Sequence, residues 1–477
     1  MRLGSLFDGS GGFPLAGTLC GIRPVWASEI EPYPIAVTRS RFPGMKHLGS
    51  VTDIHGGEIE PVDIIAFGSP CQDLSVAGKR AGLKHEGNGD DETTRSGLFM
   101  EAVRIIKEMR EATNGVYPRF VLWENVPGAF SSNEGEDFRI VCEELIKIVE
   151  LGAVMPTVPK NGWSYADHYC GDGWSLAYRV LDAQFWGVPQ RRRRIFLVVD
   201  FAGQCAGEIL FKRKGLRGYF KTGRTPWKGA AADAAGSVGA DDPSGIVLDD
   251  QGGSQITVRM DGKSPTLRAE MHGNIPCVLE QHTGVEESIP IHDKATRFQG
   301  GGPTRNGDGA GNGLGIGKQG DPAPTLSTCD RHIVTYSIGN GQLNQISMSE
   351  QCNTLDCMHD KQAVLIDQKP RYIVRRLTPT ECARLQGFPD FWGHPDRKED
   401  FTDEEYKFWL DVRNTHAAIN GKAVKDYTKQ QMLTWYNKLH SNSAEYKMWG
   451  NGIALPCALY VMQGIEEVLM KRYQKER

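Results

Sequence analysis

Short apolar runs, separated by segments with helical periodicity, organise the first two hundred residues of the chain. The runs typical of buried strands are residues 2–7, 25–28, 62–67, 120–123, 176–181 and 195–199. Between two of these runs, residues 134–151 place Phe138, Val141, Leu145 and Ile148 on one helical face. Because strands alternate with helices, the pattern predicts a doubly wound α/β domain over residues 1–200.

The pattern changes between residues 201 and 370. This span holds nearly half of the 56 glycines and many Asp, Asn, Ser and Thr residues, and it has little helical periodicity. It therefore predicts a smaller, mostly β domain of short strands and long turns. Three Thr-Leu pairs, which begin at Thr266, Thr325 and Thr354, each precede a polar stretch and a hydrophobic run. They indicate an internal repeat.

Residues 371–477 return to the helical pattern of the first domain and carry an insert at residues 394–443. Thr402 and Glu405 fit a capping box that opens one helix. Residues 428–439 predict a second helix. We expect this helical pair to pack on the flank of the first domain, which is favoured over contact with a partner.

Two of the predicted strands lead into residues suited to covalent chemistry. Pro70 and Cys71 follow the run at 62–67, and Glu124 follows the run at 120–123. In an open α/β sheet, ligands bind at the carboxyl ends of the strands. A thiolate there attacks electron-poor carbon, and a nearby carboxyl group supplies a proton. Most buried cysteines are packing residues, but the stiff turn at Pro70 and the neighbouring acid favour a nucleophile.

A glycine-rich turn at residues 7–13 connects the first strand to a helix, which is the arrangement that cradles nucleotides. Glu29 ends the second strand twenty residues after Gly9 and is suited to accept ribose hydroxyls. Asp53 and Ile54 are expected to close the next short strand, where they would meet an adenine edge. The turn lacks the full G-x-G-x-x-G spacing, so the ligand need not be a dinucleotide.

Together these motifs resemble those of the cytosine-C5 DNA methyltransferases, in the order in which that family carries them and over nearly the whole chain. The matching segments are residues 7–13, Glu29, Asp53-Ile54, Pro70-Cys71-Gln72, 95–99, Glu124-Asn125-Val126, 187–195, 376–389 and 447–453. The resemblance implies a Rossmann-like catalytic domain that uses S-adenosylmethionine and a smaller target-recognition domain at residues 201–370.

The resemblance also assigns residues to roles. The residues it places at the cofactor are Phe7, Gly9, Gly11, Gly12, Glu29, Ile30, Asp53, Ile54, Pro70, Leu98, Asn451 and Ile453. It implies that Cys71 adds to C6 of cytosine while Glu124 donates a proton to N3. Arg192 or Arg194 would favour the thiolate, and period-2 alternation places these two arginines on one face.

A cytosine inside duplex DNA must be flipped out before such chemistry can reach it. The loop after Cys71 is expected to contact DNA and to close over the base through Gln72, Ser75, Lys79 and Arg80. The resemblance implies that Thr266, Thr325 and Thr354 lie near base-reading loops; a structural role for each Thr-Leu pair is the alternative. Their uneven spacing favours one composite reader over several independent ones.

Composition limits the remaining classes of function. The formal net charge of −4 restricts DNA binding to local patches. Eleven cysteines without paired ligand spacing predict a reducing compartment and no metal site. Without a signal or membrane-spanning run, the chain is expected to be cytoplasmic and monomeric and to act on double-stranded DNA. The alternatives are an RNA cytosine-C5 methyltransferase and a non-catalytic DNA-binding relative. Whether a restriction endonuclease accompanies it stays open.

Overall fold

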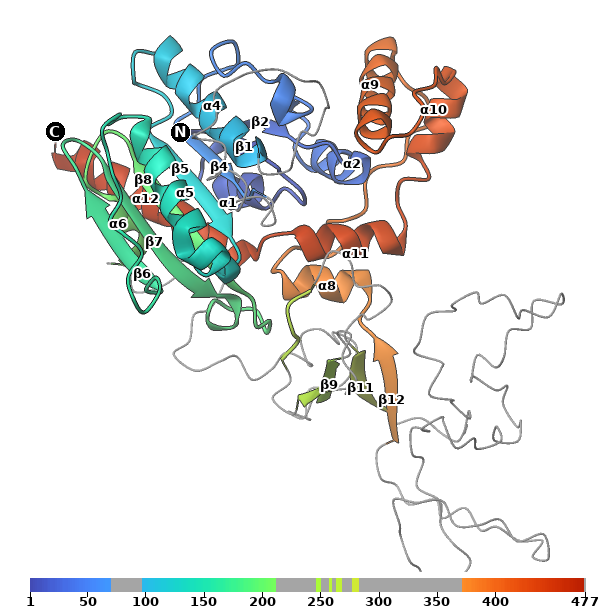
Figure 1. Ribbon diagram of the computed structural model, residues 1–477. Coiled ribbons are helices and arrows are strands. Elements are labelled where there is room, and N and C mark those ends of the chain that lie inside the picture. The colour runs from blue at the N-terminus through green and yellow to red at the C-terminus, as the bar shows by residue number, and fades with distance from the viewer. Residues whose placement is uncertain are drawn as a thin grey trace, which may run out of the picture. The chain divides into compact units, whose positions relative to one another are not determined.

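The computed structural model describes residues 1–69, 97–211, 246–249, 257–259, 263–267, 277–282 and 371–475 (Figure 1). The chain divides into two compact units. The first comprises Met1–Ser244, Met260–Glu270 and Thr378–Arg477, and the second comprises Gly245–Arg259 and Met271–Leu377. The first unit therefore extends past residue 200, where the sequence predicted a boundary, and also holds the segment 263–267.

An eight-stranded sheet forms the centre of the first unit, in the order β3-β2-β1-β4-β5-β8-β7-β6. Its strands are β1 (Arg2–Leu6), β2 (Arg23–Ser28), β3 (Lys46–His47), β4 (Ile64–Phe67), β5 (Phe120–Asn125), β6 (Ala166–Cys170), β7 (Ser175–Asp182) and β8 (Arg193–Asp200). The five strands from β3 to β5 run parallel, and β8, β7 and β6 continue the sheet antiparallel. This arrangement confirms the predicted α/β fold class.

Helices cover both faces of this sheet (Figure 1). The main helices are α1 (Gly12–Leu19), α2 (Pro32–Arg41), α4 (Gly97–Ala112), α5 (Glu136–Lys147), α6 (Ala206–Phe211), α8 (Pro379–Leu385), α11 (Asn442–Asn451) and α12 (Leu455–Lys475). A large apolar cluster joins one sheet face to α4 and α5. On the other face α12 packs against α1 and α6, and Gly464 permits the approach, because a Cβ there would lie 2.8 Å from the Ile209 carbonyl oxygen.

Two details of the predicted elements were wrong. Asp53 does not end a strand: the third strand stops at His47, Gly49 turns the chain with a φ of 74°, and Asp53 ends the 3₁₀ helix η1 (Val51–Asp53), which the Ser50 hydroxyl caps. The helix predicted over residues 134–151 spans Glu136–Lys147 instead. Glu134 has a φ of 57° and belongs to the 3₁₀ segment η4 (Ser132–Gly135) that precedes it.

The insert forms the two predicted helices, α9 (Asp403–Ile419) and α10 (Lys429–Tyr436). Thr402 and Glu405 make the expected capping box. Trp409, Met432 and Tyr436 share an apolar cluster with Ile35 of α2, so the pair packs on the flank of the first unit. No single helix within the described ranges is long and apolar enough to cross a membrane; α11 and α12, bent by 44°, pass that test only as a pair.

The second unit contains a four-stranded antiparallel sheet in the order β10-β9-β11-β12. Its strands are β9 (Ile246–Asp249), β10 (Thr257–Arg259), β11 (Cys277–His282) and β12 (Arg371–Arg376). Strand β11 is the hydrophobic run expected after the first Thr-Leu pair. The second and third pairs, at Thr325 and Thr354, lie outside the described residues.

Candidate active site

The acid predicted from sequence lies at the end of β5, beside the last residues of β4. The two strands are parallel neighbours and pair Phe67 with Trp123, so Gly68 comes next to Glu124. The approach is close: a Cβ added at Gly68 would lie 3.0 Å from Glu124 Oε2. A side chain at this position would therefore press on the carboxyl group and displace it by a few tenths of an ångström.

Ser69, which follows Gly68, is hydrogen-bonded to the β5 residues on both sides of Glu124. The indole N–H of Trp123 donates to the Ser69 hydroxyl at 3.0 Å, and the Asn125 side-chain amide donates to the Ser69 carbonyl at 3.2 Å. Trp123 and Asn125 are buried. Pro70 and Cys71 follow directly in the sequence and lie outside the described residues. The structure thus fixes the chain two residues before the predicted nucleophile, next to the predicted acid.

Glu124 is held by a partly desolvated ion pair. Arg194 Nε lies 3.1 Å from Glu124 Oε1, and the two side chains are only 13% and 14% exposed. Burial raises the pKa of the Glu124 carboxyl, and the opposing effects of Arg194 and then Arg192 do not outweigh it. A raised pKa favours the protonated form of the carboxyl group, which is the form that general acid catalysis requires.

The two arginines predicted to share one face have different surroundings. Arg192 is 2% exposed, and its guanidinium donates to the carbonyl oxygens of Leu267 at 3.2 Å, Gly450 at 3.3 Å and Gly452. Its Nε has no hydrogen-bond partner among the described residues. Burial lowers the pKa of Arg192, and Arg194 adds to this effect. Arg192 therefore joins three chain segments, whereas Arg194 is the arginine that contacts the acid.

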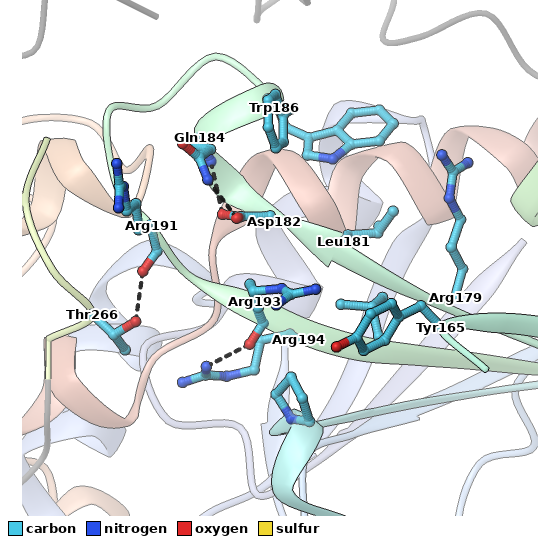
Figure 2. A pocket seen from close by; sticks show the side chains of 13 residues that line it. Tyr165, Arg179, Leu181, Asp182, Gln184, Trp186, Arg191, Arg193, Arg194 and Thr266 are labelled. Atoms are coloured by element: carbon cyan, nitrogen blue, oxygen red, sulfur yellow. Dashed lines mark hydrogen bonds between the residues drawn. The ribbon is translucent and has the colours of Figure 1, made fainter. Parts of the chain in front are cut away.

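A cavity of about 850 Å³ opens beside this arginine-rich segment (Figure 2). Its charged lining residues are Arg179, Asp182, Arg191, Arg193 and Arg194. Thr266, one of the predicted base-reading residues, donates its hydroxyl to the Arg191 carbonyl at 2.6 Å on the cavity wall. Four arginines against one aspartate make this lining strongly cationic, and the volume lies within the range of small-ligand pockets.

The glycine turn has the geometry that the nucleotide cradle requires. Gly9 and Gly11 have φ angles of 55° and 77°, which favour glycine. Glu29 supports the turn: its Oε2 accepts from the Gly9 N–H at 2.8 Å, and its Oε1 accepts from the N–H groups of Ile30 at 2.8 Å and Glu31 at 2.9 Å. Burial raises the pKa of the Glu29 carboxyl.

The C-terminal segment returns to this cradle. A Cβ at Gly12 would lie 2.2 Å from Ile453 Cγ2, so the two predicted cofactor residues are in direct contact. Asp8 Oδ2 and Ser10 Oγ are buried without a hydrogen-bond partner in the described part of the chain. Burial raises the pKa of Asp8 to about 8. The turn therefore presents two polar atoms without a partner among the described residues, close to the Glu29 carboxyl group. This arrangement fits a polar ligand such as S-adenosylmethionine.

The other predicted site residues differ in burial, and some lie outside the described residues. Leu98 packs as a half-buried residue against the main cluster, Ile54 is buried, and Asp53 and Asn451 are exposed. The predicted DNA contacts Gln72, Ser75, Lys79 and Arg80 lie outside the described residues. Sequence reasoning missed Ser69, Trp123 and Asn125 as the residues that fasten the two strand ends, although all three adjoin motifs that it used.

Comparison with known proteins supplies an independent finding. A family model described as C-5 cytosine-specific DNA methylase matches residues 1–149 and 316–408, just over half of the 477 residues. The motifs before residue 150 and the segment around residues 376–389 both fall within the matched regions.

Individual relatives are similar to this chain over different lengths. The protein named DNA N-6-adenine-methyltransferase of Escherichia phage P1 is 26% identical over 503 residues, covering 99% of this chain and 62% of that protein. Type II methyltransferase M2.BsuMI of Bacillus subtilis (strain 168) is 30% identical over 200 residues, 42% of each chain. The chain thus spans less than two thirds of the length of either relative. The solved S. pombe Dnmt2 methyltransferase aligns with TM-score 0.48 at 15% identity, covering 98% of this chain and 99% of that one.

Proposed function

Because this chain belongs to the C-5 cytosine-specific DNA methylase family, we propose that it transfers a methyl group from S-adenosylmethionine to C5 of cytosine in double-stranded DNA. The observation that carries the proposal is the position of Glu124. This buried acid pairs with Arg194 at the end of β5 and adjoins the fastened strand end that leads to Cys71.

The proposed chemistry divides between the thiol and the acid. The Cys71 thiolate adds to C6 of the cytosine ring and forms a carbon–sulfur bond. Glu124 donates its proton to N3 as the ring takes up negative charge, so C5 becomes nucleophilic. S-adenosylmethionine supplies the methyl group from its sulfonium. Loss of the C5 proton to a base then expels the Cys71 sulfur as thiolate, and return of the N3 proton to Glu124 gives neutral 5-methylcytosine.

Glu124 has the surroundings that this role requires. A general acid must be protonated before it can donate, and burial of Glu124 favours the protonated form. After the proton has left, the resulting carboxylate is stabilised by Arg194 at 3.1 Å. The same arginine therefore stabilises the product of donation, while burial opposes its lowering effect on the pKa of Glu124.

The cofactor would bind at the glycine turn. Gly9 and Gly11 provide the left-handed backbone of the cradle, and Glu29 faces it from the end of β2. Ile453 closes against Gly12 from the C-terminal segment. Glu29 already accepts three backbone N–H groups, yet each carboxylate oxygen has more than one lone pair. Of about four acceptor sites on the carboxylate, one on Oε2 therefore remains for a ribose hydroxyl; the family resemblance implies that Glu29 holds the ribose.

The cationic cavity would hold DNA together with two segments inferred from the sequence, the loop after Cys71 and residues 201–370. Arg191 and Arg193 on the cavity wall are suited to phosphate oxygens. Base flipping would bring the cytosine to Glu124, with the loop of Gln72, Ser75, Lys79 and Arg80 closing over it. Residues 201–370, including Thr266, Thr325 and Thr354, would read the target sequence.

Methyl transfer from isotopically labelled S-adenosylmethionine tests the proposal. The full chain is incubated with unmethylated genomic DNA of diverse sequence or with RNA, and the products are digested to nucleosides. We expect label in 5-methylcytosine from DNA and none from RNA, and loss of the label with Cys71→Ser.

Three outcomes would overturn the proposal. Label confined to RNA would indicate an RNA enzyme. Label in N6-methyladenine alone would mean that the chain resembles the phage P1 protein in the activity its name states. Saturable cofactor binding without any transfer would indicate a non-catalytic DNA-binding relative.

A further inference from the structure

Two histidines and a glutamate converge where the insert meets α11, away from the site described above. His394 opens the insert, His440 lies just beyond its helical pair, and Glu445 is on α11. Both histidines face the same atom: Nε2 of His440 lies 3.0 Å from Glu445 Oε2, and Nε2 of His394 lies 3.8 Å from it. The potential ligand atoms of the three residues all lie within 4.8 Å of one another.

We propose that His394, His440 and Glu445 form a binding site for a divalent transition-metal ion, of which Zn²⁺ is the best fit. Imidazole nitrogens with one carboxylate oxygen are a donor set that Zn²⁺ takes up, with a fourth position left to water. Ligands about 2.0–2.1 Å from a tetrahedral Zn²⁺ are separated by roughly 3.3 Å. The two histidine–glutamate separations lie on either side of this value.

The carboxylate is prepared for this role by its surroundings. The Glu445 side chain is 3% exposed, and its Oε1 accepts from the Trp449 indole N–H at 3.3 Å. That contact orients Oε2 towards the histidines, as outer hydrogen bonds orient metal ligands elsewhere. Gly393 allows the approach, because a Cβ there would lie 2.5 Å from Glu445 Oε1.

The backbone beside His394 is fixed from α2. Arg41 donates to the carbonyl oxygens of Phe391 at 2.5 Å, Trp392 at 3.1 Å and His394 at 2.8 Å. Tyr33 donates its hydroxyl to the Gly393 carbonyl. The rings of His394 and His440 are 4.7 Å apart at 57°. The turn that presents His394 therefore exists before any ion binds, which reduces the ordering cost of binding.

An ion at this site would join both ends of the insert to α11. Helix α11 continues into Gly450 and Gly452, whose carbonyl oxygens hold Arg192, and Lys447 on the same helix pairs with Glu31 at 3.0 Å. A bound ion would therefore stabilise the segment that closes on the glycine turn. The sequence predicted no metal site, because the three ligands are too far apart along the chain to form a motif.

Metal titration of the full chain tests the proposal. Protein stripped with a chelator is titrated with Zn²⁺ against a chromophoric indicator, and with Co²⁺ by visible absorption. We expect one equivalent of metal per chain and a tetrahedral Co²⁺ spectrum. The double variant His394→Gln, His440→Gln should bind at least about 100-fold more weakly. His416→Gln is the matched control, because His416 faces the Glu31 carboxylate at 3.6 Å outside the cluster.

Thermal unfolding provides a second readout. Zn²⁺ that binds only the folded chain should raise the Tm of wild type and of His416→Gln but not that of the double variant. The histidine side chains are 44% and 39% exposed, so the metal-free variants should melt close to metal-free wild type. If the double variant fails to fold, His394→Gln alone takes its place. Equal Zn²⁺ affinity in wild type and the histidine variants, or equal loss in His416→Gln, would overturn the proposal.

Discussion

Replacing Glu124 by Gln removes the transferable proton but keeps the shape of the side chain. Gln keeps the volume and one hydrogen-bond acceptor towards Arg194, 3.1 Å away, but it has no proton that it can transfer to N3. General acid catalysis is worth about 10²–10⁴ in rate. We therefore expect kcat of Glu124→Gln to fall by about this factor, which corresponds to roughly 3–5 kcal/mol of transition-state stabilisation.

Stability should change far less than rate. Burial shifts the Glu124 carboxyl towards its neutral form, and a neutral amide of similar volume replaces it. The free energy of unfolding should therefore change less than the activation free energy. Cofactor affinity should be unchanged, because the glycine turn is supported by Glu29 instead. Single-turnover kinetics, urea unfolding and cofactor titration on the same preparation measure the three quantities.

The pH profile identifies the group responsible. Wild-type kcat/KM should decline at high pH as Glu124 loses its proton, and this basic limb should be absent from the residual activity of Glu124→Gln. Near-normal turnover of Glu124→Gln would refute the reasoning, since the proton would then come from another group. A loss of stability as large as the loss of rate would refute it as well.

Four further predictions concern single features of the same unit. Arg194→Gln removes a group that lowers the pKa of Glu124, so the basic limb of the pH–rate profile should move to higher pH; an unchanged limb would mean that the pair does not control the acid. Gly12→Ala places a Cβ 2.2 Å from Ile453 Cγ2 and should weaken cofactor binding by about tenfold or more in calorimetry, whereas Gly44→Ala, with open space around it, should not. The pKa of Asp8 is raised to about 8, so its contribution to stability is full below its ordinary pKa of 3.8 and is lost as pH rises through about 8; Asp8→Asn should therefore gain stability relative to wild type over that range, and parallel curves would contradict this. Methylome sequencing of Thr266→Ala, Thr325→Ala and Thr354→Ala should show weakened methylation at every target if the repeats form one reader, and selective loss of one motif would contradict that hypothesis.

The sequence was sufficient to predict the strands that carry the candidate chemistry. Buried parallel strands are continuous apolar runs, so β4 and β5 were recognised from composition alone, and their neighbouring positions followed from the fold class. The polar strand β6 was not predicted, because four of its five residues are exposed and their alternation carries no hydrophobic signal. Asp53 was misplaced for a related reason: Gly49 and the Ser50 cap act locally and override a short strand-like run.

Contacts between residues far apart in the chain could not be predicted from the sequence. The Glu124–Arg194 pair follows from the antiparallel pairing of β5 with β8, and the apolar pattern of β8 does not reveal the direction of that strand. The convergence of His394 and His440 on Glu445 depends on the length and packing of the insert helices. Such contacts require the tertiary structure, because neither residue type nor spacing encodes them.

The arginine run shows how one motif serves two physical purposes. Arg192 directly precedes β8 and Arg194 is its second residue. Both act on Glu124 electrostatically, yet only Arg194 forms the ion pair. Arg192 donates to carbonyl oxygens from two distant segments of the chain, and leaving a buried acceptor unsatisfied typically costs about 1–3 kcal/mol. Substitution of Arg192 therefore tests whether the C-terminal segment stays against the glycine turn, whereas substitution of Arg194 tests the acid. Loss of activity at both positions would have different causes, and only unfolding measurements beside the rates distinguish them.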